Sequence, residues 1–222
     1  MKVLGIVGSY RRKGNTELLV REALRGAEEL GAQVDLLFLR ELDVRPCDGC
    51  YSCRRKGICH IRDDMQKVYI KLLDSQGIIF GTPVYMRSMC GQMKVFLDRI
   101  TALGYPVRRL ANRVGGVITV AERTGHSLTN GIFQFFFSSH RMIATDHVSG
   151  LARGKGEILK DSHAMKAARE LGKQMVLLIQ SRFAFPEEYK IPLYRYVDEK
   201  YGCSPCPYHS PVKKMTGPRK KP

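Results

Sequence analysis

KVLGIVGSYRRKGNT (residues 2–16) joins a short apolar run to a polar, glycine-containing segment, and the architecture can be read outward from that change. Residues 2–8 are apolar and rich in β-branched side chains without alternation, which is typical of a strand buried on both faces. Behind the polar segment, apolar residues recur at helical spacing from Leu19 to Leu30. Gly31 is expected to end this helix. The segment therefore predicts a strand, a loop and a helix in succession.

The same alternation continues along the chain. Further strands are expected over residues 32–39, 77–81, 114–120 and 142–145. Helices are expected over residues 63–75, 93–100, 127–141 and 164–182, the first with Asp63 as its cap and Gln66 as the capping partner. Such alternation predicts a parallel sheet with right-handed crossovers and helices on both faces. Five such strands make a doubly wound α/β domain, which binds ligands at the carboxyl ends of its strands.

The loop after the first strand has the chemistry of a phosphate site. Ser9 and Thr16 offer hydroxyls, Asn15 offers an amide, and the following helix offers free N–H groups and the positive end of its dipole. Gly14 permits close backbone approach, and Arg11 or Lys13 adds positive charge. The loop is not G-x-G-x-x-G and has no G-K-[ST] ending, so a monophosphate fits better than a pyrophosphate. The alternative is a simple turn that Asn15 caps.

Four cysteines lie within thirteen residues, in CDGCYSCRRKGIC (residues 47–59). Cys47, Cys50, Cys53 and Cys59 are spaced C-x2-C-x2-C-x5-C, and Gly57 lets the backbone bend back toward the first three thiols. A cubane iron–sulfur cluster takes four thiolates arranged in this way. A zinc site is the main alternative, although structural zinc sites usually pair two separated C-x2-C knuckles. An empty, reduced loop is a further alternative.

Composition narrows the class of protein. The chain has 222 residues, 44% of them hydrophobic and 26% charged, as expected for one full-sized globular domain. No apolar run is long enough to span a bilayer, and residues 3–7 are too short for a signal peptide. We therefore expect a cytoplasmic protein whose seven cysteines serve metal or redox chemistry rather than disulfides. A net charge of +16 should attract anionic ligands and acidic proteins.

The pattern changes after Phe185. Residues 186–222 are rich in proline and show no sustained period, so we expect a domain over 1–185 followed by an extended arm and a basic tail. Five basic side chains lie in residues 213–222. Cys203 and Cys206 are open to three interpretations: a redox dithiol, a second metal site with His209, or two incidental thiols.

Three motifs together resemble the flavodoxin-like iron–sulfur flavoproteins and their NAD(P)H-dependent FMN reductase relatives. They are GSYRRKGNT (residues 8–16), the four-cysteine spacing followed by Asp63-Asp64, and GTPVYM (residues 81–86). The similarity is clear over about residues 1–100 and looser to about residue 182. It implies a flavodoxin-like five-stranded sheet in the order 2-1-3-4-5, with FMN at the carboxyl ends of the strands.

The resemblance also implies where each cofactor would lie. The FMN phosphate would lie on the first loop, at Ser9, Arg11, Lys13, Gly14, Asn15 and Thr16. The isoalloxazine ring would lie against Thr82, Pro83, Val84, Tyr85 and Met86, and against Ala121, Glu122, Arg123, Thr124 and Gly125. The iron ligands would be Cys47, Cys50, Cys53 and Cys59. Pro83 stiffens a loop that must hold a flat ring, and Tyr85 offers a stacking face; the alternative for Tyr85 is a buried core aromatic.

These features predict a flavin-dependent oxidoreductase that transfers electrons between FMN and a 4Fe–4S cluster, the cofactors carrying the chemistry. The alternative is a cluster-free NAD(P)H-dependent reductase of FMN or quinones, with zinc or free thiols in the cysteine loop. Nucleic-acid binding by the basic tail is a third hypothesis, disfavoured because no recognised motif is present. The expected partner is NAD(P)H or a protein such as an acidic ferredoxin, and the resemblance suggests a homodimer or homotetramer.

Overall fold

The computed structural model describes residues 1–191, 196–197 and 200–201. The chain divides into two compact units, Met1–Phe185 and Pro186–Pro222. Within the second unit, the described residues include the short 3₁₀ turn η4, Glu187–Lys190. The arm and tail expected beyond residue 185 stay a prediction, and Cys203, Cys206 and the basic residues 213–222 lie outside the described residues.

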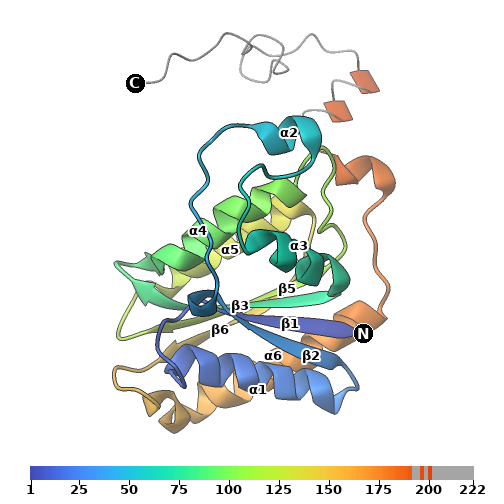
Figure 1. Cartoon of the computed structure of the whole chain (residues 1–222). Helices are drawn as coiled ribbons and strands as arrows, with labels where there is room; N and C mark the ends of the chain where they lie inside the picture. Colours follow the sequence, from blue (N-terminus) through green and yellow to red (C-terminus); the bar gives the residue numbers. More distant parts are fainter. Residues whose placement is uncertain (192–195, 198–199, 202–222) are drawn as a thin grey trace, which may run out of the picture. The chain divides into compact units, whose positions relative to one another are not determined.

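A parallel sheet forms the centre of the first unit (Figure 1). Its strand order is β2-β1-β3-β5-β6, and the short β4 pairs antiparallel with the end of β3. Counted over the parallel strands alone this is the order 2-1-3-4-5, so the predicted doubly wound sheet is confirmed. The strands are β1 (Lys2–Val7), β2 (Gln33–Phe38), β3 (Gly77–Tyr85), β4 (Ser88–Met89), β5 (Val114–Ala121) and β6 (Ile143–Leu151).

Two strands are longer than the sequence predicted. β3 continues past Gly81 because Thr82 and Pro83 still pair with β5, opposite Thr119 and Val120. β6 runs to Leu151 instead of ending near residue 145. It is an edge strand with alternating buried and exposed positions, so its polar outward residues concealed its continuation.

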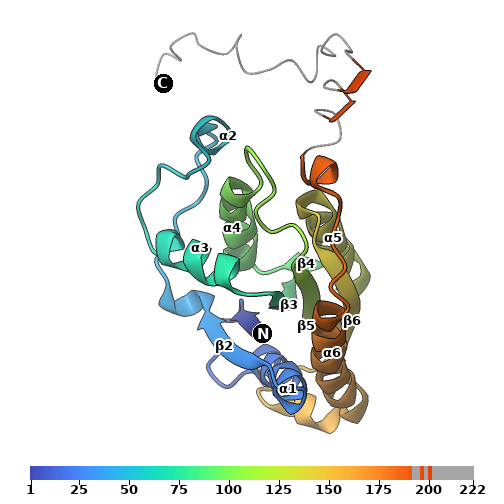
Figure 2. The ribbon, with the colours of Figure 1, turned by 90° about the vertical axis from the view of Figure 1, so that its right-hand side faces the viewer.

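Helices cover both faces of the sheet, as predicted (Figures 1 and 2). α1 (Asn15–Glu29) and α6 (Ser162–Gln180) lie on one face, while α3 (Met65–Asp74), α4 (Gly91–Ile100) and α5 (His126–His140) lie on the other. The remaining turns are α2 (Ser52–Lys56), η1 (Leu39–Glu41), η2 (Thr101–Leu103) and η3 (Glu157–Lys160). No helix in the described residues is long and apolar enough to cross a membrane.

The two helix layers bury separate cores. Alternate residues of the strands point to opposite faces, so Leu4 and Ile6 pack with α3, α4 and α5, whereas Val3 and Val7 pack with α1 and α6. The first core contains an aromatic group in which the Phe80 ring centroid lies 5.5 Å from that of Phe133. Close packing of this kind makes the sheet a rigid base for the loops at its carboxyl edge.

α1 and α6 approach so closely that their backbones touch. A Cβ atom on Gly26 would lie 1.9 Å from the Arg169 carbonyl oxygen, and one on Gly172 would lie 1.8 Å from that of Ala23. Neither position has room for any side chain. This crossing holds the C-terminal half of α1, and the opposite, N-terminal end of the helix faces the carboxyl edge of the sheet.

Candidate functional site

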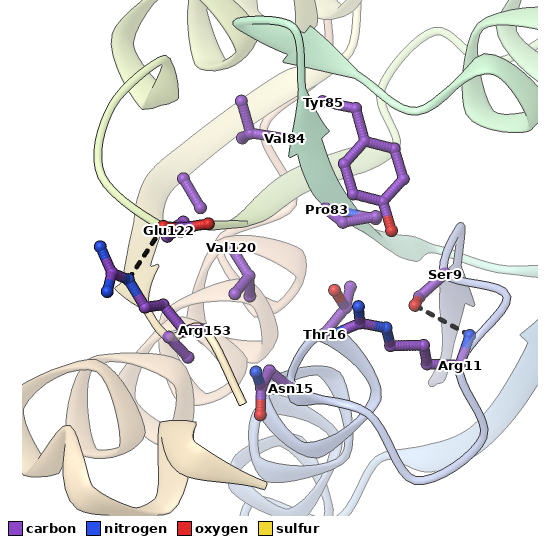
Figure 3. A pocket seen from close by; sticks show the side chains of 12 residues that line it. Ser9, Arg11, Asn15, Thr16, Pro83, Val84, Tyr85, Val120, Glu122 and Arg153 are labelled. Atoms are coloured by element: carbon purple, nitrogen blue, oxygen red, sulfur yellow. Dashed lines mark hydrogen bonds and ion pairs between the residues drawn. The ribbon is translucent and has the colours of Figure 1, made fainter. Parts of the chain in front are cut away.

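A cleft opens at the carboxyl ends of β1, β3, β5 and β6 (Figure 3). Its volume is about 160 Å³. It lies where the strand order reverses between β1 and β3, the usual ligand position in such a sheet. Its lining residues are Ser9, Arg11, Asn15, Thr16, Pro83, Val84, Tyr85, Val120, Ala121, Glu122, Ala152 and Arg153.

The first loop presents an open helix end to this cleft. Gly14 is the N-cap of α1, and no side chain among the described residues caps that end. The N–H groups of the first turn therefore remain available. Ser9 and Thr16 are nearly buried, and the Thr16 hydroxyl has no hydrogen-bond partner in the described part of the chain. The backbone N–H of Arg11 donates to Ser9 Oγ at 3.2 Å, which tightens the loop.

Asn15 and Lys13 have structural contacts of their own. Asn15 lines the cleft, but its Nδ2 donates to the Gly154 carbonyl at 2.8 Å and so ties the first loop to the segment after β6. Lys13 has a φ of 51°, and its backbone N–H donates to Glu17 Oε2 at 2.8 Å. Neither Lys13 nor Gly14 lines the cleft. Asn15 does not cap α1 in the way that the simple-turn alternative required.

The end of β3 forms one wall. Pro83, Val84 and Tyr85 line the cleft, and Tyr85 is half-exposed rather than a buried core aromatic. Thr82 is fully buried behind them, where its Oγ1 accepts a hydrogen bond from the Cys90 backbone N–H at 3.2 Å. Met86 is 98% exposed at the tip of the β3–β4 hairpin and does not line the cleft.

The loop after β5 forms the facing wall, where Ala121 and Glu122 line the cleft but Arg123, Thr124 and Gly125 do not. Gly125 has a φ of 103°, and a Cβ there would lie 2.8 Å from Val84 Cγ1. Only glycine therefore lets this loop approach the β3–β4 hairpin. Glu122 Oε1 accepts a hydrogen bond from Arg153 Nε at 2.9 Å, and Figure 3 shows this pair across the cleft from Tyr85.

The four predicted metal ligands lie together on one loop, between η1 and α3. All four are free thiols: Cys47 and Cys50 are exposed, and Cys53 and Cys59 are half-buried. The short helix α2 carries Cys53 and ends at Gly57, whose φ of 70° turns the backbone as expected. Burial raises the pKa of the Cys53 thiol, and negative charge on Cys59 and Cys47 raises it further. The thiols are thus close enough to influence one another.

A buried ion pair closes the base of this loop. The side chains of Arg99 and Asp63 are 0% and 1% exposed, and Arg99 Nη2 donates to Asp63 Oδ1 at 3.0 Å. Arg99 Nη1 also donates to the Arg45 carbonyl at 2.7 Å, and the Arg45 N–H donates to Asp63 Oδ2 at 3.0 Å. Arg99 of α4 thereby connects Arg45, on the N-terminal side of the cysteines, with Asp63, on their C-terminal side, in one hydrogen-bond network.

The charge of Asp63 depends on this network. Burial alone would raise the pKa of the Asp63 carboxyl, but hydrogen bonds from Arg99, from the Arg45 N–H and from the Met65 N–H outweigh it, so the pKa lies below its ordinary value. The Gln66 side chain accepts from the Asp63 N–H at 3.0 Å, as the predicted capping box requires. The N-cap of α3 is Asp64, however, one residue later than predicted. Asp63 itself accepts from Met65, the first residue of α3.

The segment after α4 also contacts the cysteine loop, near α2. Arg109 Nη2 donates to the Gly57 carbonyl at 2.6 Å and to the Ala102 carbonyl at 2.7 Å. The Arg54 guanidinium lies 5.0 Å from the centre of the Tyr105 ring. In Figures 1 and 2, α2 lies beyond the layer of α3 and α4. The cleft, by contrast, is lined by residues at the carboxyl ends of the strands, and none of the four cysteines is among them. The two candidate sites are therefore separate within one chain.

Comparison with known proteins identifies the family. Residues 1–155 match the family of NADPH-dependent FMN reductases. The chain belongs to this family. It is 36% identical over 192 residues to an iron–sulfur flavoprotein of Methanocaldococcus jannaschii, covering 81% of this chain and 98% of that protein. It is 32% identical over 180 residues to an iron–sulfur flavoprotein of Methanosarcina thermophila, covering 79% of this chain and 93% of the relative.

A solved structure supports the fold. The flavodoxin, WrbA-like protein from Agrobacterium tumefaciens superimposes with a TM-score of 0.59 at 16% identity, covering 82% of this chain and 99% of that one. The predicted family resemblance and flavodoxin-like fold are thus confirmed, and this member of the FMN reductase family is a flavin-dependent oxidoreductase.

The cleft of this family member fits FMN. A terminal phosphate needs N–H donors, hydroxyls and a cation, and the uncapped end of α1, the unpartnered Thr16 hydroxyl and Arg11 lie together in the lining. The half-exposed Tyr85 and the apolar side chains of Pro83 and Val84 offer a surface for a flat ring. The arrangement provides binding groups for a monophosphate at one end and an aromatic ring at the other.

Three lining residues were missed from the sequence: Val120, Ala152 and Arg153. Ala152 and Arg153 directly follow β6, whose end was predicted six residues too early. The general rule that ligands lie at the carboxyl ends of parallel strands would have found Arg153, had the edge strand been followed to Leu151. Val120 is the last interior residue of β5 and carries no signal beyond its position.

Proposed function

We propose that this oxidoreductase is an iron–sulfur flavoprotein, with FMN in the cleft and a 4Fe–4S cluster on Cys47, Cys50, Cys53 and Cys59. The observation that carries the cluster is the grouping of four free thiols on one loop whose two ends are joined by the buried Arg99–Asp63 pair. A flexible thiol-rich turn would not need such an anchor. The names of the M. jannaschii and M. thermophila relatives support the same assignment.

The chain's own groups have distinct tasks in this proposal. The first turn of α1 and the hydroxyls of Ser9 and Thr16 bind the FMN phosphate, and Arg11 neutralises its charge. Pro83, Val84 and Tyr85 hold the ring on one side, and the loop that begins at Ala121 and Glu122, the two of its residues that line the cleft, lies along the pyrimidine edge. Bound FMN supplies one- and two-electron transfer and the cluster supplies one-electron transfer. Arg54, Arg55 and Lys56 of α2 offset the negative charge of four thiolates.

The phosphate assignment is tested by a pair of neighbouring arginines. Arg11 lines the cleft, whereas Arg12 is exposed and does not. Arg11→Ala should weaken FMN binding by about tenfold or more, because a hydrogen bond to a charged group contributes about 1.5–3 kcal/mol. Arg12→Ala should leave the dissociation constant almost unchanged. Equal effects of the two variants, measured by fluorescence titration, would show that only general positive charge matters.

The cluster is tested by composition. The full chain, purified anaerobically, should contain about four iron and four sulfide per FMN, and Cys50→Ala should lose the iron while retaining FMN. FMN without iron in the unmodified protein would instead support a cluster-free NAD(P)H-dependent reductase of flavins or quinones. That second candidate is favoured by the family match itself, which describes NADPH-dependent FMN reductases. Steady-state NADPH oxidation by iron-free protein would then identify it.

The separation of cleft and cysteine loop bears on assembly. We propose a homo-oligomer in which the cluster of one subunit approaches the flavin of another, since α2 lies away from the carboxyl edge of its own sheet. At an FMN concentration that fills the Cys50→Ala subunits but leaves the Arg11→Ala subunits largely empty, mixed oligomers of the two variants should regain electron transfer that neither variant supports alone. If the mixtures stay inactive at every ratio, transfer within one subunit is the better account.

The basic surface suggests the type of protein partner. A net charge of +16 favours an acidic electron carrier such as a ferredoxin, in addition to NAD(P)H. Electron transfer with such a carrier should slow markedly between low and high ionic strength, because salt screens exposed charges. A rate independent of salt would argue against this partner.

A further inference from the structure

One group of potential metal ligands in the cysteine loop differs from the four-cysteine set. Asp48, Cys50 and His60 each place one ligand atom within 4.8 Å of the other two. His60 Nε2 lies 2.7 Å from Asp48 Oδ2, and the Cys50 backbone N–H donates to Asp48 Oδ1 at 3.2 Å. In the part of the chain that the structure describes, this is the single group of three such residues at this spacing.

The distances between ligand atoms distinguish a site for a single ion from a site for a four-iron cluster. A cubane cluster binds its four thiolates on four different iron atoms, so their sulfur atoms stand well apart. A single ion needs its ligand atoms close together, and the trio meets that condition while the other three cysteines do not join it. Thiolate, imidazole nitrogen and carboxylate oxygen are the three protein ligand types of Zn²⁺, which takes four ligands in a tetrahedron.

Local backbone structure brings the trio together without a metal. Gly49 has a φ of 68° and turns the chain between Asp48 and Cys50. α2 and the turn at Gly57 then bring the chain back, so that His60 reaches Asp48 from twelve residues further on. The side chains of Asp48 and His60 are each 48% exposed, which leaves an ion free access and room for water as a fourth ligand.

We propose that Asp48, Cys50 and His60 form a binding site for a single divalent ion of the Zn²⁺ class, in competition with the cluster for Cys50. On binding, the Cys50 thiol releases its proton to solvent and its sulfur becomes a ligand. Asp48 and His60 are not cluster ligands, so the two metal sites can be separated by mutation. The ion site does not depend on the proposed cluster, whereas the competition rests on it.

The test uses the full chain with FMN bound and iron removed by a chelator under anaerobic conditions, titrated with Co²⁺ and then displaced by Zn²⁺. Absorption from thiolate-to-Co²⁺ charge transfer counts the sulfur ligands, and one thiolate is expected. His60→Ala and Asp48→Ala should each weaken binding at least tenfold. Cys47→Ser, which removes a cluster ligand only, and His163→Ala, which removes an exposed histidine of α6, should change the affinity less than twofold.

Each other outcome overturns the proposal. Charge-transfer intensity from three or four thiolates, with loss of binding in Cys47→Ser, would place the ion on the four cysteines. Absence of Co²⁺ and Zn²⁺ binding, or binding unaffected by His60→Ala, would also remove the site. Iron analysis of untreated protein reports on the cluster separately, so a failed ion site and a failed cluster are distinguishable. If both centres exist, zinc should lower the iron recovered on cluster reconstitution, and less so in His60→Ala.

Discussion

The cleft and the cysteine loop are held in opposite ways. The cleft is assembled from short loops at the ends of buried strands, and the element that we propose to bind the phosphate is the uncapped N-terminal end of α1. The cysteine loop extends over residues 42–64 with only the short α2 inside it, and it depends on side chains from elsewhere, above all Arg99 of α4. Loops longer than roughly 12–15 residues are uncommon unless they serve a function. The packed sheet fixes the positions of residues at the ends of its strands, so a binding site there needs little further support. A long loop needs side-chain contacts from other elements to hold its conformation.

The two regions should differ in how much stability a single substitution removes. A buried ion pair adds little net stability over an apolar pair, but breaking it leaves a charge without a partner in the interior. The cysteine loop is therefore sensitive to single substitutions at its base, while the exposed ion pairs around the cleft are tolerant. Substitutions at the two sites can therefore separate these two kinds of support.

Arg99→Ala should have the largest effect. It leaves the Asp63 carboxylate buried and unpaired, which should lower the free energy of unfolding by about 3–5 kcal/mol and reduce the iron recovered per FMN. Arg153→Ala is the matched control at the cleft, because its partner Glu122 is 57% exposed; the expected loss is about 0–1 kcal/mol. Urea unfolding measures both. Similar losses in the two variants would contradict the contrast.

Lowering the pH from 6.5 to 4 should reduce the free energy of unfolding, because a buried histidine packs against the segment that supports the cysteine loop. His140 is buried beneath Gly104 of the segment that carries Arg109, and burial first, then the charge of Arg108, lowers its pKa from 6.5 to about 4. The unfolded chain then binds the extra proton, so stability should fall by about 3 kcal/mol as the pH drops from 6.5 to 4. The Asp63 carboxyl, whose pKa is lowered, affects stability in a lower pH range. Its stabilisation of the folded state is complete above its ordinary pKa of 3.8 and is lost as the pH falls below that value.

This pH effect is checked by urea unfolding at pH 7 and at pH 4.5. His140→Leu should remove most of the difference between the two pH values, although it also loses the contact with the Phe136 ring. His163→Leu, at an exposed position in α6, should retain the full difference. A pH difference that survives in His140→Leu would assign the acid sensitivity to another group.

Substitution of Gly125, in the loop that forms one wall of the cleft, should have the next largest effect on stability. Gly125→Ala puts a side chain at a φ of 103° and 2.9 Å from the Arg87 Cα, so we expect a loss of about 2 kcal/mol and weaker FMN binding. Gly131→Ala in the interior of α5 meets no atom within 4 Å and should stabilise the protein by about 0.5–1 kcal/mol. Opposite signs for the two glycines are the expected result in thermal unfolding. A neutral Gly125→Ala would mean that the hairpin moves freely.

The smallest effect concerns the tie between the two ends of the cleft. Asn15→Ala removes the hydrogen bond to Gly154 and should cost about 1 kcal/mol. FMN binding should weaken modestly, because Arg153 lies beside that carbonyl. Double substitution with Arg153→Ala should then add little to the effect on FMN affinity. Full additivity would show that the two residues act independently.

The alternating strands and helices, the polar first loop and the four clustered cysteines could be predicted from the sequence, because each depends on residues that are close together in the chain. Three features became visible in the folded chain alone: β6 extends to Leu151, Arg153 lines the cleft, and Arg99 holds the base of the cysteine loop. Asn15 and Gly154 are 139 positions apart, and Arg99 and Asp63 are 36 apart. Hydrogen bonds between residues so far apart in the chain form only when separate elements pack on one sheet. They cannot be predicted from a local pattern of polarity or spacing.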